Sequence, residues 1–209
     1  SSPRVYLREL LQNACDAISA RKEVDAGGGR IRITALAGPD TDFVLRDDGV
    51  GLTAEDVTSL LATVGRSSKR DIFDLPRSDY LGQFGIGLLS CFMVAEEIRI
   101  RSRSARGGAP VEWIGHSDGT FTLRELDGTE AATVPVGTSV HLRPRFDQTD
   151  LLNYPAVLDM ATTFGQYLPV PIDLDSPSGG TVRVTEDAPF LPEAELGARV
   201  AFGTALVGS

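Results

Sequence analysis

Residues 7 to 17 read "LRELLQNACDA" and carry the clearest structural signal in the chain. Their apolar members recur at three- and four-residue spacing, so they line one stripe of a helix that turns ~100° per residue. On the same helix Glu9, Asn13 and Asp16 fall together on the opposite side, because steps of three and four residues bring side chains into line. A solvated outer face is one interpretation of these three residues. Asn is a mediocre helix former, however, and an exposed position could have carried Lys, Glu or Gln at less cost.

The composition is that of an ordinary globular protein. The chain has 209 residues, of which 42% are hydrophobic and 23% are charged, which is enough for one substantial core. The net charge of −9 argues against nucleic acid and anionic membrane as main partners, because phosphate contacts need clustered Lys and Arg. Cys15 and Cys91 stand alone, which favours small buried thiols in a reducing compartment.

Targeting signals are not visible in the sequence. No apolar run approaches the ~20 residues of a membrane helix, and the start lacks a basic segment followed by a hydrophobic one. We therefore expect no membrane span, no signal peptide and a cytoplasmic location. The first residues are Ser-Ser-Pro rather than Met, so we expect a piece of a longer protein.

Helical and strand patterns alternate and end in a meander of strands. Alternating apolar residues predict strands at 30–36, 43–47, 96–104, 111–117, 119–126, 137–145 and 170–175. Helical spacing predicts further helices at 53–65, 85–95 and 150–168, the last broken or begun by Pro155. A strand meander favours antiparallel pairing. We therefore predict an α+β fold, a two-layer α/β sandwich whose mostly antiparallel mixed sheet is covered on one face by helices.

Two segments lack a steady period. Residues 65–81 mix charges with Pro and Ser and are predicted to form a long mobile loop. From residue 176 the chain becomes rich in Gly and Pro. The sequence therefore predicts one domain over 1–175, followed at 176–209 by a linker or the start of a truncated further domain.

The stretch "LRDDGVGLT" at 45–53 ends a predicted strand in two carboxylates and two glycines. Its glycines also fit the G-x-G-x-x-A dinucleotide pattern, but a pyrophosphate there would meet Asp47 and Asp48 at once. We favour a site where glycine lets the backbone approach a flat ligand and Asp47 accepts hydrogen bonds from an amino group. A tight turn capped by acidic residues is the alternative.

Two later stretches are compatible with ligand binding. In "GQFGIGLLS" at 82–90, glycines lead into an apolar helix, where backbone amides and the helix dipole favour an anion such as phosphate. A hinge without ligand is the alternative. In "GTSVHLRPR" at 137–145, Gly137 and Thr138 open a strand, a pattern with almost no specificity by itself.

Other polar residues have plainer interpretations. His116 and His141 lie far apart in the sequence and offer no metal-site spacing. Trp113 is expected to be a core or sheet-face aromatic residue. The strand "IRIRSRS" at 98–104 alternates in a way that suits an exposed sheet face, and a basic patch for an acidic partner is the alternative.

Taken together and in this order, the four motifs resemble the ATP-binding (Bergerat-type) fold that DNA gyrase, the ninety-kilodalton heat-shock chaperones, histidine kinases and MutL repair proteins share. The resemblance is closest to the heat-shock chaperones, in particular the bacterial, HtpG-like members. It rests on "YLRELLQNACDA" at 6–17, "LRDDGVGLT" and "GQFGIGLLSCFMVA" at 82–95. It covers about residues 2 to 175 and is strongest in the first half.

The resemblance implies roles for the polar face of the first helix. Glu9 matches the carboxylate that acts as general base on the attacking water. Asn13 matches the residue that binds the nucleotide and holds Mg²⁺ through its side-chain oxygen. Asp16 matches a polar residue near the purine and sugar.

The same resemblance implies how ATP or ADP is held elsewhere. Asp47 matches the carboxylate that accepts a hydrogen bond from the adenine amino group, Gly51 the glycine beneath the ring, and Thr138 a hydroxyl that supports Asp47 directly or through water. The amides expected at the phosphates belong to Gly82, Gln83, Phe84, Gly85, Ile86 and Gly87. Residues 65–81 become a lid that closes over bound ATP.

Several positions depart from the family pattern. Arg66 in "GRSS" stands where the chaperones usually have a phosphate-binding Lys, Leu60 where an Asn is expected, and Leu88 where an aromatic residue is usual. The chain also lacks the swapped N-terminal strand and the middle domain that supplies an arginine to the γ-phosphate. We therefore expect ATP and ADP binding, with slow or absent hydrolysis by this piece alone.

Two functions follow from the resemblance. The favoured one is the ATP-binding domain of a molecular chaperone, an ATPase that forms a homodimer at full length and acts on client proteins. The other is a nucleotide-sensing interaction module that binds ATP without turnover. Glu9 favours the ATPase, because a sensor has no use for a general base.

Overall fold

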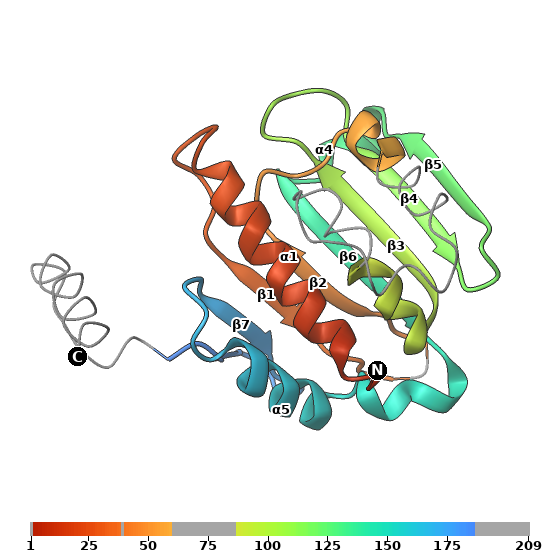
Figure 1. The fold of residues 1–209 in the computed structure, drawn as a ribbon, viewed down its shortest axis with the longest axis vertical. Coiled ribbons are helices and arrows are strands. Elements are labelled where there is room, and N and C mark those ends of the chain that lie inside the picture. The colour runs from red at the N-terminus through yellow and green to blue at the C-terminus, as the bar shows by residue number, and fades with distance from the viewer. Residues whose placement is uncertain (1, 39, 60–86, 187–209) are drawn as a thin grey trace, which may run out of the picture.

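The structure is a computed structural model that describes residues 2–38, 40–59 and 87–186. Eight strands form a single sheet, and the longer helices lie on one of its faces (Figure 1). The predicted α+β sandwich with a mostly antiparallel sheet is therefore confirmed. Among the described residues no helix is both long and apolar enough to cross a membrane.

The sheet runs in the order β5-β4-β3-β6-β2-β1-β7-β8. Its strands are β1 (Ile31–Thr34), β2 (Phe43–Asp47), β3 (Ala95–Arg103), β4 (Val111–His116), β5 (Phe121–Glu125), β6 (Gly137–Pro144), β7 (Ile172–Asp175) and β8 (Thr181–Arg183). All neighbouring pairs are antiparallel except β1 and β7, which are parallel. This order places the end of β2 beside the start of β6, so two predicted motifs meet.

The helices are α1 (Val5–Arg21), α4 (Gly128–Ala132) and α5 (Tyr154–Gly165), with 3₁₀ turns η1 (Ser90–Met93) and η2 (Phe146–Leu151). Residues 54–59 are also helical, and the rest of the helix predicted at 53–65 lies outside the described residues. Pro155 lies in the first turn of α5, and the Asn153 side chain accepts a hydrogen bond from the Ala156 N–H at 3.0 Å. Pro155 therefore begins this helix and does not break it.

The helix predicted at 85–95 extends too far. The described part is helical at 87–89, tightens into η1, and gives way to β3 at Ala95. Ala95 pairs with Pro144 of β6, so sheet pairing overrides the apolar helical pattern. The short helix α4 has no counterpart among the predicted elements.

The core lies between the sheet and helices α1 and α5, which pack side by side (Figure 1). The predicted apolar stripe of α1 is buried, at Leu7, Leu10, Leu11, Ala14, Ala17 and Ile18. Tyr6 meets Phe43 of β2 edge to face, with ring centroids 5.8 Å apart, and its hydroxyl donates to the Leu151 carbonyl at 2.9 Å. Both cysteines are free and buried, and burial raises the pKa of Cys15 to about 11.

The sheet continues past residue 175, where the sequence predicts the end of the first domain. Strand β8 pairs with β7, and Val184 and Thr185 are buried after it. The described fold therefore includes residues up to 186, and the position of the domain boundary stays a prediction.

Candidate functional site

The polar face of α1 meets the glycine motif in space. Asn13 is only 4% exposed although its face of the helix is polar. A Cβ placed on Gly87 would lie 3.1 Å from Glu9 Oε2 and 3.3 Å from Asn13 Nδ2, so these three residues are immediate neighbours. The buried Asn13 Nδ2 has no hydrogen-bond partner in the described part of the chain. An unpaired buried amide is costly, so this end of α1 suits a polar ligand.

Glu9 has a partner that the sequence analysis missed. Arg8 donates to Glu9 Oε1 from Nη2 at 2.8 Å and from Nε at 3.2 Å. The Glu9 side chain is 21% exposed and that of Arg8 is 54% exposed, so the arginine approaches from the solvent side. The sequence does show a cation directly before the candidate base. Helical spacing rules consider residues three and four apart, so they do not identify such an adjacent pair.

The Arg8→Gln variant tests whether this pair positions Glu9. We expect ADP affinity to change by less than about twofold, because an exposed ion pair contributes under ~1 kcal/mol. Turnover by a longer form of the chain that hydrolyses ATP should fall by about two- to fivefold, because the carboxylate is less well held. The control is Arg4→Gln, which removes the ion pair between Arg4 and Asp159 at the same end of α1. Equal losses in both variants would contradict a positioning role.

Asp16 lies one turn further along the same face of α1. It is partly buried, and its Oδ1 accepts a hydrogen bond from Gln12 Nε2 at 2.9 Å. Its placement is compatible with the predicted contact near the purine and sugar, which stays a prediction.

Asp47 ends β2 and is 5% exposed. Its Oδ1 accepts the Gly49 N–H at 2.9 Å. Burial is the main cause that raises the pKa of Asp47 to about 7. The hydrogen bond from the Gly49 backbone lowers this pKa, the negative charge of Asp48 raises it, and the Thr138 backbone lowers it. A carboxylate that is shielded from water in this way can accept a hydrogen bond from a neutral group of a ligand.

Two glycines near the end of β2 hold conformations and contacts that no other residue fits. Gly51 has φ +69°, and a Cβ there would lie 2.0 Å from the Arg103 carbonyl oxygen. Gly137 has φ +118°, and a Cβ there would lie 2.2 Å from the Asp47 carbonyl oxygen. Sequence reasoning proposed Gly51 as a close-approach glycine, and the close approach is to backbone of β3 in the described structure. Gly137 received no role, yet it is what lets β6 lie against Asp47.

The Gly137→Ala variant should lower the free energy of unfolding by about 3 kcal/mol, because both its φ and its contact with a backbone oxygen must change. Chemical denaturation measures this directly. Gly119→Ala is the matched control: Gly119 has φ +91° but nothing within 4 Å of a Cβ, so only about 1 kcal/mol should be lost. Similar losses in both variants would mean that the contact with Asp47 contributes nothing.

Thr138 belongs to a buried hydroxyl network. Its Oγ1 lies 2.9 Å from Ser102 Oγ, which also donates to the Gly137 carbonyl at 2.9 Å and accepts the Leu52 N–H at 2.8 Å. Ser102 is fully buried and was missed, although it stands where the inner face of "IRIRSRS" departs from Ile. The network fixes the turn after Asp47 to strands β3 and β6. A link from the Thr138 hydroxyl to Asp47 through water stays a prediction.

Several predicted site residues cannot be placed. Arg66, Gly82, Gln83, Phe84, Gly85 and Ile86, the lid at 65–81 and Leu60 all lie outside the described residues. Leu88 is 3% exposed and packs in the hydrophobic core.

Comparison with known proteins agrees with this geometry. Residues 1–117 match the family described as histidine kinase-, DNA gyrase B-, and HSP90-like ATPase. The chain belongs to this family. As a member, it is a nucleotide-binding domain of the ATPase type, and its resemblance to HSP90-like proteins is confirmed.

Individual relatives point in the same direction. The chain is 29% identical over 197 residues to the chaperone protein HtpG of Mycobacterium tuberculosis (strain H37Rv), which covers 84% of this chain and 30% of the relative. It is 32% identical over 170 residues to HtpG of Mycobacterium ulcerans, covering 72% and 25%. It is 28% identical over 187 residues to the mitochondrial heat shock protein 75 kDa of Rattus norvegicus, covering 84% and 26%. The chain therefore spans between a quarter and a third of the length of these relatives.

Proposed function

We propose that this chain is the ATP-binding domain of a heat-shock-90-like molecular chaperone. The observation that carries the proposal is that the candidate site has two chemically different ends. One end is the buried carboxylate of Asp47, and the other is the group of Glu9, Asn13 and Gly87. The Asp47 end suits a neutral ring that carries an amino group. The end at Glu9 and Asn13 suits an anion that binds together with a metal cation. Adenine nucleotides have both parts.

At the adenine end, ionised Asp47 accepts a hydrogen bond from the amino group of the ring. The Gly49 N–H and the backbone of Thr138 hold the carboxylate, while Gly51 and Gly137 keep the surrounding backbone close. The result is a rigid acceptor in a dry setting, where a hydrogen bond to a charged group is strong.

At the phosphate end, Asn13 is the residue that would hold Mg²⁺. Its Oδ1 would be the atom on the ion, while its buried Nδ2, which has no partner among the described residues, fits an acceptor such as a phosphate oxygen or a water. The described residues contain no group of three or more His, Cys, Asp or Glu that could hold a metal ion by itself. An ion held mainly by phosphate oxygens and water needs only one protein ligand, and Mg²⁺ supplies charge neutralisation for the phosphates when bound. The amides of 82–87 complete this end of the proposal.

Glu9 acts as the general base: it orients the attacking water and takes its proton. We expect hydrolysis by this piece alone to be slow or absent. In the longer protein, ATP binding closes the lid at 65–81, promotes homodimer contact and drives the folding of client proteins in the cytoplasm. The names of the relatives support the chaperone part of this proposal.

The affinity for ADP should depend on pH through Asp47. Its pKa of about 7 in the free protein means that half of the molecules carry a neutral carboxyl at that pH. Ionised Asp47 binds the amino group better, so affinity should rise as pH increases through about 7 and binding should release a proton. Calorimetry in two buffers of different ionisation enthalpy measures that proton. A flat affinity from about pH 6 to 8, with no proton release, would contradict it.

Calorimetric titration of the chain with ADP, with and without Mg²⁺, tests the proposed function. We expect saturable binding to one site that Mg²⁺ strengthens. Guanine nucleotides serve as the control, because a guanine ring presents an oxygen where adenine presents its amino group. If ADP does not bind, or if adenine and guanine nucleotides bind equally well, the proposal is wrong.

A further inference from the structure

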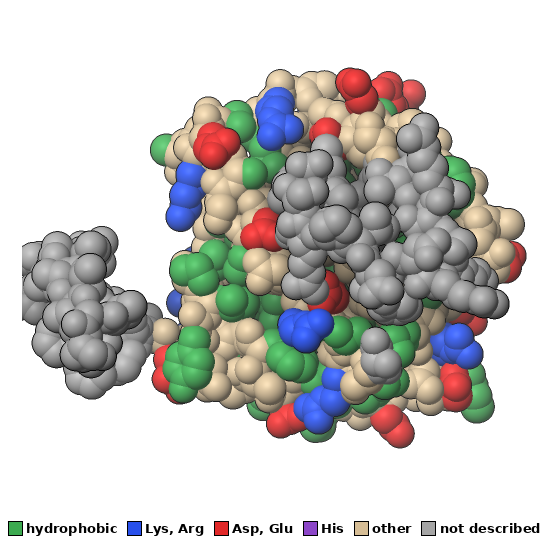
Figure 2. Space-filling view, viewed as in Figure 1, with side chains coloured by type: hydrophobic (Ala, Val, Ile, Leu, Met, Phe, Trp, Pro, Cys, Tyr) green, Lys and Arg blue, Asp and Glu red, His purple; other side chains and the backbone are tan. Residues whose placement is uncertain are grey.

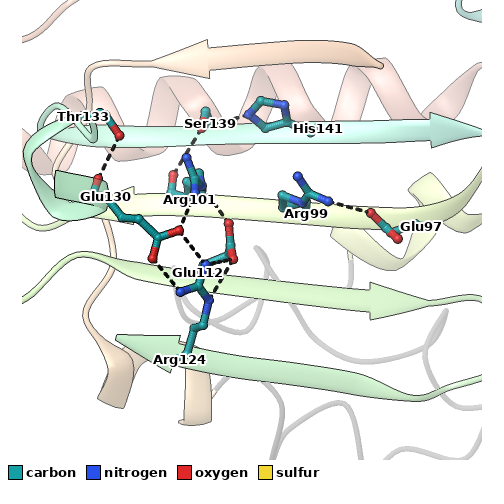
Figure 3. A network of polar contacts seen from close by, with 9 residues as sticks. All are labelled: Glu97, Arg99, Arg101, Glu112, Arg124, Glu130, Thr133, Ser139 and His141. Carbon is teal, nitrogen blue, oxygen red and sulfur yellow. Dashed lines mark hydrogen bonds and ion pairs between the residues drawn. The ribbon is translucent and has the colours of Figure 1, made fainter. Parts of the chain in front are cut away.

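The face of the sheet opposite α1 and α5 has no covering layer among the described residues except at one end. There the segment of α4 bonds Arg101, Arg103 and Arg124. On β3, Ile98 and Ile100 point into the core, and the residues that alternate with them point to this open face, namely Glu97, Arg99, Arg101 and Arg103. Figure 3 shows the polar side chains that lie there on β3, β4 and β6, with α1 behind the sheet. The open face therefore consists largely of charged side chains on a flat backbone.

One end of the open face is balanced in charge. Glu112 is 5% exposed and accepts from Arg101 Nε at 2.7 Å and from Arg124 Nη2 at 2.7 Å. Arg124 Nη1 also lies 2.7 Å from Glu130 Oε2. Two arginines and two carboxylates therefore neutralise one another over β3, β4 and β5 (Figure 3).

The middle of the open face, over β2, β6 and β3, has an excess of positive charge. Glu97 is shared by Arg99 at 3.2 Å and Arg143 at 3.6 Å. Arg46 forms no ion pair with any residue of the described ranges, and Arg103 donates to the Val134 and Ala131 carbonyls, which carry no charge. The net charge of the whole chain is −9, so this excess is local. On the helix-covered face, Figure 2 shows Lys and Arg side chains scattered singly.

Ser139 and His141 of β6 lie between the arginines of β2 and those of β3. Arg46 on β2 pairs with Ser139 on β6, and Arg99 on β3 pairs with His141 on β6. Side chains opposite each other on neighbouring strands are ~5 Å apart at Cβ. His141 Nε2 lies 3.3 Å from Ser139 Oγ, and Arg99 Nε is buried without a partner among the described residues. The unpaired Nε of Arg99 and the Arg46 cation, which has no ion-pair partner among the described residues, therefore lie on this part of the open face.

The pKa of His141 is affected by the same positive charges. Burial lowers its pKa most, Asp42 acts to raise it, and Arg99, Arg46 and Arg101 lower it further. Asp42 is thus opposed at His141 by three arginines. The surroundings of His141 are therefore positive, and an anion would be attracted to them.

We propose that the open face over β2, β6 and β3 docks an acidic segment of a partner protein, with one carboxylate held between Arg46 and Arg99. Guanidinium groups match carboxylates in planar, two-bond geometry. Glu97 and Glu112 among the arginines, and the negative charge of the whole chain, oppose the long phosphate backbone of a nucleic acid. This inference does not depend on the proposed function, because the open face lies on the other side of the sheet from α1.

Fluorescence anisotropy with a labelled octaglutamate peptide tests the docking surface. In low salt we expect saturable binding, a Kd raised about tenfold by Arg46→Gln and partly restored by Arg46→Lys. Lys22→Gln is the matched control, since it removes one exposed cation at the end of α1. Its Kd should stay unchanged, and the melting temperature of each variant should stay within about 2 °C of the parent chain.

Other outcomes would overturn the docking proposal. They are no saturable binding, equal binding of octaglutamine, and equal weakening by Arg46→Gln and Lys22→Gln. Tighter binding of an eight-nucleotide single-stranded DNA would make the face a nucleic-acid site. Self-association in sedimentation that Arg46→Gln abolishes would make the occupant a second copy. A loss of ADP binding in Arg46→Gln would also count against docking, because Arg46 would then act on Asp47 through β2. If Asp47→Asn loses ADP binding but still binds octaglutamate, the proposed nucleotide site is tested separately and the docking proposal stands.

Discussion

Asn in place of Asp47 will weaken ADP binding by roughly 100-fold, the largest effect on affinity that we expect from any single change. The variant keeps the shape of the side chain but removes the charge, and an amide nitrogen then competes for the position that faces the adenine amino group. Since Asp47 is 5% exposed, water cannot replace the lost acceptor. Calorimetric titration of both chains with ADP and Mg²⁺ measures the difference.

The stability of this variant shows whether lost binding reflects lost folding. The pKa of Asp47 is raised to about 7 in the folded chain, so folding favours the protonated carboxyl. This contribution is fully present below the unfolded value of about 4 and is lost as the pH rises through about 7. The Asn variant has no such titration, so at pH 8 it should be at least as stable as the parent chain.

A neighbouring carboxylate provides the control for Asp47. Asp48 Oδ1 accepts the N–H groups of Gly29 at 2.7 Å and Arg30 at 2.8 Å, which an Asn oxygen can also do. Asp48→Asn should therefore leave ADP affinity within about threefold. If both variants lose the same affinity, or if Asp47→Asn binds normally, our assignment of the adenine end is wrong.

Glu9→Ala should separate binding from hydrolysis. The variant should bind ADP within about threefold of the parent chain, because Glu9 contributes a base and no direct ligand to the nucleotide. In a longer form of the chain that hydrolyses ATP, turnover should fall by at least about 100-fold, the usual range for a general base. Phosphate release under saturating ATP measures this.

Glu9→Gln is the sharper companion, because it keeps the size and polarity of Glu9 but cannot take up a proton. It should lose as much turnover as Glu9→Ala. Unchanged turnover in either variant would remove Glu9 from the mechanism. It would then favour a nucleotide-sensing module, in which lid position rather than hydrolysis is the output.

Periodicity predicted those parts of the fold that depend on one element at a time. The apolar stripe of α1 and the alternation of β1, β2 and β3 follow from burial on a single face, and both are confirmed. The other strands do not alternate cleanly. The end of the helix at 87–89 depended on Ala95 pairing with Pro144, a contact between segments far apart in the sequence. A pattern within one window does not contain that information.

The candidate site divides in the same way. Asp47 and Asn13 were visible because a carboxylate beside glycines, and an amide within a helix, are unusual in their local settings. Ser102 and Gly137 were not, because their importance arises only when β3, β6 and β2 are in register. The Arg8 contact with Glu9 depends on side-chain direction, which sequence spacing does not fix.

The parallel pairing of β1 and β7 connects distant parts of the chain mechanically. β8 is bonded to β7, β7 to β1, and β1 to β2, the strand that ends in Asp47. A pull on the chain beyond residue 186 would therefore travel across these ladders of hydrogen bonds, perpendicular to the strands, toward Asp47, the carboxylate that we propose binds adenine. Tension from a neighbouring domain and occupancy by nucleotide would then act on the same strand.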